Sequence, residues 1–135
     1  MKRLSIILLS TLFCLTLMGQ HYIGMSKTDI IKLMNKTNPG FDLDEGVVNK
    51  TYNYLKFVDK YNEETWLFFL SEDNICTHTK LMSDFSNLNL RTKYLNDNYK
   101  KSGASTWTYT VKGVTYNVEL IKEEWYFTIV TKKKK

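Results

Sequence analysis

The chain has 135 residues, 43% hydrophobic and 24% charged, which suits one domain with a modest core. Of its 19 basic residues, two stand near the start and four end the chain, so residues 20–131 carry 13 basic side chains against all 14 acidic ones. This nearly neutral body argues against a basic groove for nucleic acid. The terminal lysine run, residues 132–135, is typical of a solvated tail.

The first 19 residues have the layout of a cleaved secretory signal peptide. Lys2 and Arg3 precede an apolar run of 15 residues, and Gly19 is a small residue at which a peptidase could cut. The run is shorter than the roughly 20 residues that a membrane-spanning helix needs. Cys14 follows the bulky Phe13, which does not suit a lipoprotein cleavage motif. We expect a secreted or periplasmic protein, with an uncleaved membrane anchor as the alternative.

Residues 20–131 are predicted to form the folded domain, which starts with a helix capped by Ser26. Asp29 stands three residues later, which is the spacing of a capping box. Asn38-Pro39 ends the helix, because proline lacks the amide hydrogen and restricts the residue before it. A polar loop is expected over residues 41–51.

Three strands are predicted next, over residues 52–59, 65–70 and 75–82, with polar turns between them. If both turns are simple hairpins, Asp59 pairs with Glu64, and Ser71 pairs with Asn74. Because side chains alternate along a strand, this register assigns every residue to a face. The predicted core face carries Leu55, Phe57, Trp66, Phe68, Leu70 and Ile75.

The opposite face of these strands is unusually apolar. The middle strand, TWLFFL, is apolar on both faces, whereas a strand with one solvated face normally alternates apolar and polar residues. The second face carries Tyr54, Val58, Leu67, Phe69, Cys76 and His78. Either the other half of the chain covers this face, or a partner does.

A second helix is predicted from Asp84 to about Lys101, followed by a three-stranded meander. In the meander, Lys112-Gly113 fits a two-residue hairpin turn that pairs Tyr109 with Tyr116. A four-residue turn over residues 121–124 would pair Leu120 with Trp125. Ten apolar residues then share one face, Trp107, Tyr109, Val111, Val114, Tyr116, Val118, Leu120, Trp125, Phe127 and Ile129, while threonines dominate the other.

The predicted order is helix, three strands, helix, three strands. This is an α+β fold of the form αβββ-αβββ, with two helices packed on antiparallel sheet. The repeated order suggests an internal duplication. The strands could form one continuous sheet or two separate layers.

The stretch from Gly24 to Ile30, GMSKTDI, followed by Leu33-Met34 and Pro39, resembles the opening of small outer-membrane assembly lipoproteins of the SmpA/OmlA type. The tandem layout of helix and meander also resembles β-lactamase-inhibitor-protein-like domains. These resemblances imply an envelope protein that binds other proteins and has no catalytic residues. No lipid-acceptor cysteine stands at the expected mature start, and no functional residue can be transferred.

Candidate chemistry is limited to Cys76 and His78, which lie two apart on a strand and could supply a nucleophile and its base. No third orienting group is evident, and two ligands are too few for a zinc site. The sequence shows no motif for a metal or cofactor, and we expect none.

The sequence therefore favours an exported non-enzymatic domain that binds a protein or another envelope component. The candidate binding residues are Tyr54, Leu67, Phe69, Cys76 and His78. The alternatives are a small cysteine-dependent enzyme that uses Cys76 and His78, or a small-ligand carrier with its pocket between sheet and helices. No nucleic-acid partner is expected, and the sequence does not specify an oligomeric state.

Overall fold

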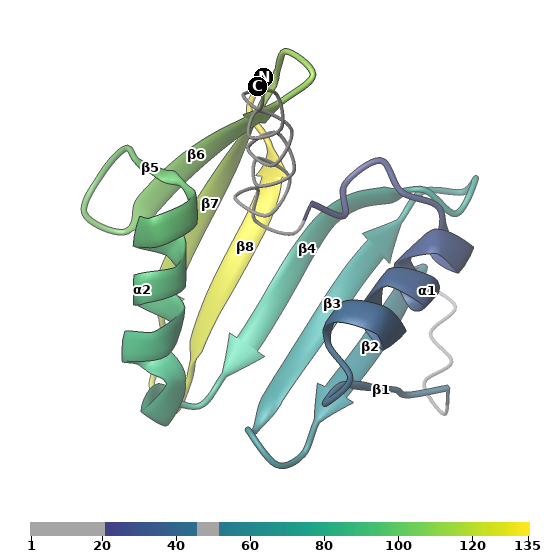
Figure 1. Ribbon diagram of the computed structural model, residues 1–135, viewed down its shortest axis with the longest axis horizontal. Helices are drawn as coiled ribbons and strands as arrows, with labels where there is room; N and C mark the ends of the chain where they lie inside the picture. Colours follow the sequence, from purple (N-terminus) through teal and green to yellow (C-terminus); the bar gives the residue numbers. More distant parts are fainter. Residues whose placement is uncertain (1–20, 46–51) are drawn as a thin grey trace, which may run out of the picture.

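The computed structural model describes residues 21–45 and 52–135, so the predicted signal peptide lies outside the described residues. The described chain folds as two successive sets of one helix and four strands (Figure 1). The first set is α1 (Lys27–Thr37), β1 (Asp42–Leu43), β2 (Tyr54–Asp59), β3 (Glu64–Leu70) and β4 (Cys76–Ser83). The second is the 3₁₀ turn η1 (Phe85–Asn87), α2 (Leu88–Asn98), β5 (Lys100–Lys101), β6 (Thr106–Val111), β7 (Val114–Lys122) and β8 (Phe127–Lys133).

All eight of these strands form one antiparallel sheet in the order β1-β2-β3-β4-β8-β7-β6-β5. The two sets, called here the first half and the second half, therefore meet edge to edge where β4 pairs with β8. The predicted α+β class with antiparallel sheet is confirmed. The form αβββ-αβββ differs from the structure, because each half holds an additional two-residue strand, β1 or β5.

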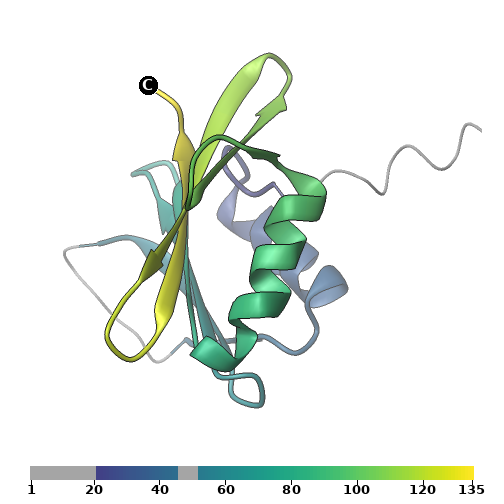
Figure 2. The same ribbon diagram turned by 90° about the vertical axis from the view of Figure 1, so that its left-hand side faces the viewer.

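Both helices lie on the same side of the sheet, and no other described helix or strand covers the opposite side (Figure 2). We call these sides the helix face and the open face. The core lies between the helices and the helix face, and its fully buried members come from both layers. They include Ile30 and Met34 of α1, Phe57 and Phe68 of β2 and β3, and Phe127 of β8.

Helix α1 forms where the sequence predicts it. The Ser26 hydroxyl accepts a hydrogen bond from the Asp29 amide, which is the expected N-cap interaction. Ile30 and Met34, one turn apart, are both fully buried against the sheet. Asn38 ends the helix before Pro39, as predicted.

Helix α2 is shorter than predicted. The predicted range of residues 84–101 divides into η1, α2 and β5. Asp84 caps the 3₁₀ turn, where its carboxylate accepts a hydrogen bond from the Ser86 amide. At the other end, Tyr99 leaves the helical conformation and Lys100 begins β5. Asparagines within this segment are weak helix formers, which is consistent with an early end.

Two hairpins have the predicted register. Asp59 pairs with Glu64 in the β2–β3 hairpin, and Tyr109 pairs with Tyr116 in the β6–β7 hairpin. In the second turn, Lys112 and Gly113 both adopt positive φ angles, of 50° and 79°, as a two-residue turn of this kind requires.

The β7–β8 hairpin has the predicted faces but a different register. Strand β7 continues to Lys122, which pairs with Phe127, and Leu120 pairs with Ile129 rather than with Trp125. The shift of four residues is even, so Phe127 and Ile129 keep their core positions. Trp125 instead lies in the turn and is 78% exposed, so its predicted core position is wrong.

The β3–β4 hairpin contains a bulge that the sequence did not reveal. Phe69 pairs with His78, but Leu70 pairs with Cys76, so Thr77 is an extra residue between the two pairs. Before β4, residues 74–76 also make backbone hydrogen bonds to residues 24–27, the segment that leads into α1. The predicted pairing of Ser71 with Asn74 is wrong, because the Ser71 amide donates its hydrogen bond to the Ile75 carbonyl oxygen. Ile75 is 37% exposed, so its predicted core position is also wrong.

Strand β8 extends into the terminal lysine run. Lys132 and Lys133 belong to β8, where Lys132 pairs with His78 on one side and Asn117 on the other. The first half of the terminal lysine run is thus part of the sheet.

Candidate functional site

The open face carries four of the five predicted binding residues, in two neighbouring rows of the sheet. One row runs across Tyr54, Phe69, His78, Lys132, Asn117 and Thr108. The next runs across Lys56, Leu67, Lys80, Val130, Glu119 and Thr106. Tyr54, Leu67, Phe69 and His78 are therefore adjacent, and we call these four residues the open-face patch.

Ring contacts hold the open-face patch together. The Phe69 and His78 rings stack with a centroid separation of 4.3 Å and an interplanar angle of 4°. The Tyr54 ring lies 6.0 Å from Phe69 on the other side. These rings come from three consecutive strands, so the sheet itself fixes their spacing. Each of the four side chains keeps part of its surface exposed.

His78 is partly shielded in this stack. Its Nδ1 lies 2.9 Å from the Thr77 hydroxyl oxygen. Burial lowers the pKa of His78, and the positive charge of Lys132 lowers it further. The imidazole is therefore neutral at pH 7, which suits a ring that stacks on an apolar neighbour.

Cys76 does not belong to the open-face patch, contrary to the sequence prediction. The bulge at Thr77 turns Cys76 to the helix face, where it is 2% exposed within the core. Its thiol donates a 3.6 Å hydrogen bond to the His78 carbonyl oxygen. Burial raises the pKa of Cys76 to about 12, because a thiolate is poorly solvated there.

Cys76 and His78 therefore cannot act as a nucleophile and its base. Their side chains project from opposite faces of the sheet, and the protonated thiol is a poor nucleophile. The cysteine-dependent enzyme that the sequence left open is contradicted by this geometry. Within residues 21–45 and 52–135, no group of three or more His, Cys, Asp or Glu side chains could hold a metal ion.

Lysines lie beside the open-face patch. Lys80 is the neighbour of Leu67 in its row, and Lys132 is the neighbour of His78. Lys56 lies on the other side of Leu67 and contacts the Asp44 carboxylate at 3.5 Å. Among the described residues, Lys80 and Lys132 form no ion pair. The patch thus has an apolar centre next to unneutralised positive charge.

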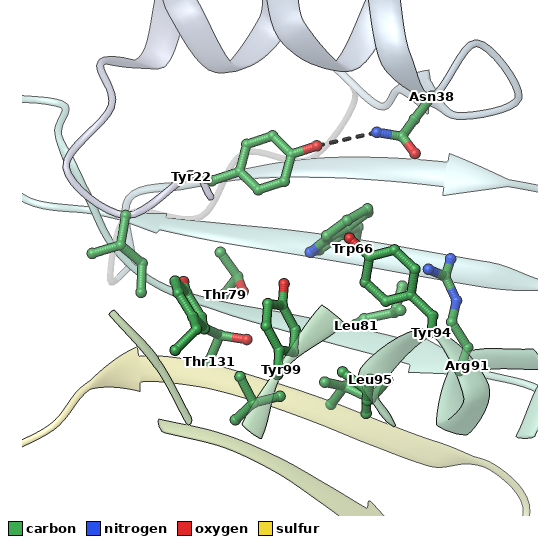
Figure 3. A pocket seen from close by; sticks show the side chains of 14 residues that line it. Tyr22, Asn38, Trp66, Thr79, Leu81, Arg91, Tyr94, Leu95, Tyr99 and Thr131 are labelled. Carbon is green, nitrogen blue, oxygen red and sulfur yellow. Dashed lines mark hydrogen bonds between the residues drawn. The ribbon is translucent and has the colours of Figure 1, made fainter. Parts of the chain in front are cut away.

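The helix face holds a second candidate site, a cavity of about 120 Å³. It lies between the helices and the sheet, and both halves contribute to its walls. Figure 3 shows side chains from α2, from the segment around α1 and from the central strands directed to the same space. Its labelled residues are Tyr22, Asn38, Trp66, Thr79, Leu81, Arg91, Tyr94, Leu95, Tyr99 and Thr131. The sequence pointed to this region only in general terms, because its residues are scattered along the chain.

Arg91 lies at one side of this cavity and is held in an ion pair between the halves. Its Nε and a terminal nitrogen donate hydrogen bonds of 2.8 and 2.7 Å to the two Glu64 carboxylate oxygens. The guanidinium also lies 5.9 Å from the Trp66 ring centroid. Glu64 thus neutralises the one formal charge in the cavity lining.

Comparisons with known proteins do not identify a family. No family model, no curated protein and no solved structure matches this chain. The resemblance of GMSKTDI to envelope lipoproteins therefore stays a prediction. Of the helices in the described ranges, none has the length and apolar character needed to cross a membrane.

Proposed function

We propose that the protein is an exported, non-enzymatic binding domain whose open-face patch contacts a protein partner. The observation that carries this proposal is the apolar character of the open face in the first half, which no described helix covers. A sheet with one solvated face normally presents polar residues there. Leu67 and Phe69 instead leave apolar surface in contact with water, which is typical of interaction sites.

The proposed partner has an apolar centre and acidic groups beside it. Phe69 and Tyr54 supply rigid aromatic surface of the kind that dominates binding energy at interfaces. Lys80 and Lys132 supply positive charge beside that surface, which favours an acidic partner and its rate of association. Partner strand addition is disfavoured, because the edge strands β1 and β5 have only two residues each.

The test compares the double substitution Leu67→Ser/Phe69→Thr with a matched change in the second half, Thr106→Ser/Thr108→Ser. A photo-crosslinking side chain at Tyr54 would be used to capture the partner from an envelope fraction. We expect the first substitution to reduce capture at least tenfold and the second to leave it unchanged, with both variants folded by circular dichroism. A folded Leu67→Ser/Phe69→Thr variant with full capture would refute the proposal.

The acidic character of the partner is tested separately. Lys80→Glu should reduce capture several-fold, and added salt should weaken the wild type more than this variant. Lys112→Glu, in the exposed β6–β7 turn, is the matched charge control and should have little effect. If the captured species is a second copy of this chain, the proposed partner is wrong; sedimentation of the purified protein would reveal such a dimer.

Export is part of the same proposal and rests on the composition of residues 1–19. Cleavage after Gly19 would leave Gln20 as the first residue of the mature chain. N-terminal sequencing of protein recovered from expressing cells tests this. A mature protein that keeps Lys2 and sediments with membranes would support the uncleaved anchor instead.

A further inference from the structure

The cavity on the helix face has a polar floor at the line where the two halves meet. Thr79 of β4 and Thr131 of β8 are direct partners across that line. The next inward-facing pair along the same two strands is Leu81 with Ile129, as expected for a core. The threonine pair therefore interrupts an apolar surface at the position where the cavity lies.

The hydroxyl groups of this pair are not engaged by other side chains or backbone groups of the described residues. No hydrogen bond joins the Thr79 or Thr131 side chain to any other described residue. Both threonines line the cavity, so their hydroxyl groups are available to a polar group inside it. A hydrogen bond from such a group to either hydroxyl would contribute to binding.

The walls of the cavity are aromatic. Trp66 of β3, Tyr94 of α2 and Tyr99 after α2 all contribute to the lining (Figure 3). On the far side, the Tyr22 hydroxyl already accepts a 3.1 Å hydrogen bond from the Asn38 side chain. Aromatic edges and faces favour a flat ring over an aliphatic chain.

Size and charge limit the occupant further. A cavity of 150 Å³ accommodates benzene in another protein, so about 120 Å³ is the scale of a single small ring. Arg91 is neutralised by Glu64, so the lining offers no free charge to an anion. A charged ligand would lose its hydration without a counter-charge.

We infer that this cavity binds a neutral compound with one aromatic ring and a hydroxyl group, in which the hydroxyl pairs with Thr79 and Thr131 and the ring lies among Trp66, Tyr94 and Tyr99. The site lies on the opposite side of the sheet from the open-face patch. Ligand binding here and partner binding there are therefore separable, and either can fail without the other.

Phenol is a suitable probe, with toluene as the comparator that lacks the hydroxyl. Titration of the full-length protein, followed by two-dimensional NMR of the backbone amides, should give saturable binding of phenol with one site. The largest shifts should fall on β4 and β8 near Thr79 and Thr131. Toluene should bind more weakly, because it leaves both hydroxyls unpaired.

The variants Thr79→Val and Thr131→Val keep the side-chain shape and remove one hydroxyl each. Each should weaken phenol binding by about threefold to tenfold, the effect of one net hydrogen bond, and leave toluene binding unchanged or improved. Thr128→Val is the matched control, because Thr128 is a buried threonine of the same strand on the open face. It should leave phenol binding unchanged.

Three results would overturn the inference. One is the absence of saturable phenol binding, which would mean that ordered water alone occupies the cavity. Another is equal binding of phenol and toluene. The last is an unchanged phenol affinity in both Thr79→Val and Thr131→Val when thermal unfolding shows that the variants are folded. Partner capture through the open-face patch should be the same in these variants as in the wild type.

Discussion

The two halves share a backbone plan but differ in what they present on the open face. In the first half this face carries Leu67, Phe69 and Tyr54, which are apolar and stacked. In the second half the corresponding face carries Thr106, Thr108, Thr115, Asn117 and Glu119. A pocket there is lined mostly by polar side chains.

This difference separates what the fold needs from what function adds. The second half shows that a three-stranded meander of this plan is complete with a threonine-rich open face, because its helix-facing side chains supply the core. Packing therefore does not require Leu67 and Phe69 to be apolar. The second half is the internal reference against which the open-face patch of the first half stands out.

If the open face of the first half is a second core, then its apolar residues serve packing and not binding. Phe68 and Phe69, which are neighbours on β3, distinguish these two explanations. Phe68 is fully buried on the helix face, so Phe68→Ala should cost about 3–5 kcal/mol of unfolding free energy. Phe69 faces the other way and is partly exposed, so Phe69→Ala should cost about 1 kcal/mol. Chemical denaturation measures both. Equal losses would mean that something covers the open face in solution.

The next largest effect tests whether the halves form one unit. Glu64 belongs to the first half and Arg91 to the second, and their side chains are only 7% and 20% exposed. Glu64→Ala leaves the guanidinium without its counter-charge and should cost about 3 kcal/mol. The unfolding transition should stay single. The double variant Glu64→Leu/Arg91→Leu should recover much of the loss, and a variant as unstable as Glu64→Ala would contradict the ion-pair explanation.

High pH should destabilise the helix face. The pKa of Cys76 rises from 9.0 to about 12 on folding, so the native state retains a proton that the unfolded state loses. The contribution is fully present below pH 9 and is lost as the pH rises toward 12, on the order of 1 kcal/mol by pH 10. Thermal unfolding at pH 8 and pH 10 measures the change. Cys76→Ala should show a smaller difference between the two pH values, and an identical difference would exclude the thiol as its source.

The smallest expected effect is on stability and comes from Thr128, a residue on the open face of the second half. Thr128 belongs to the threonine-rich face opposite the core, yet it is 1% exposed and its Oγ1 has no hydrogen-bond partner among the described residues. Thr128→Val keeps the shape and removes the unpaired hydroxyl, so it should stabilise the protein by about 1 kcal/mol. Thr110→Val, at an exposed position on β6, is the control and should change the melting temperature little.

Local signals in the sequence were sufficient for much of the fold. The Ser26 cap and the Asn38-Pro39 end located α1, and the Lys112-Gly113 turn set the register of β6 and β7. Tyr54, Leu67 and Phe69 lie on one face as predicted, because alternation along a strand requires only the local pattern. His78 lies on the same face only because the bulge at Thr77 offsets the error in the predicted turn register.

The errors arose where residues distant in the chain decide the geometry. Cys76 was misplaced because the bulge at Thr77 accompanies pairing of residues 74–76 with residues 24–27, which no short pattern records. The predicted position of Trp125 is wrong because a turn over residues 121–124 and a turn over residues 123–126 give the same alternation of faces. The hairpin adopts the second turn, which lengthens β7 to Lys122. The sequence did not identify the residues that line the cavity, because Thr79 and Thr131 come together only when β4 pairs with β8.

Caps, turns and periodicity within each segment therefore predict α1, six of the eight described strands and the face to which most side chains belong. The joining of the halves through β4 and β8, and the position of both helices on one side, depend on contacts between distant segments. This arrangement leaves the open-face patch without a cover from any described helix and creates the cavity on the opposite side of the sheet. The physical reason is that long-range strand pairing and layer packing minimise the exposed apolar area of the whole chain, which no single segment encodes.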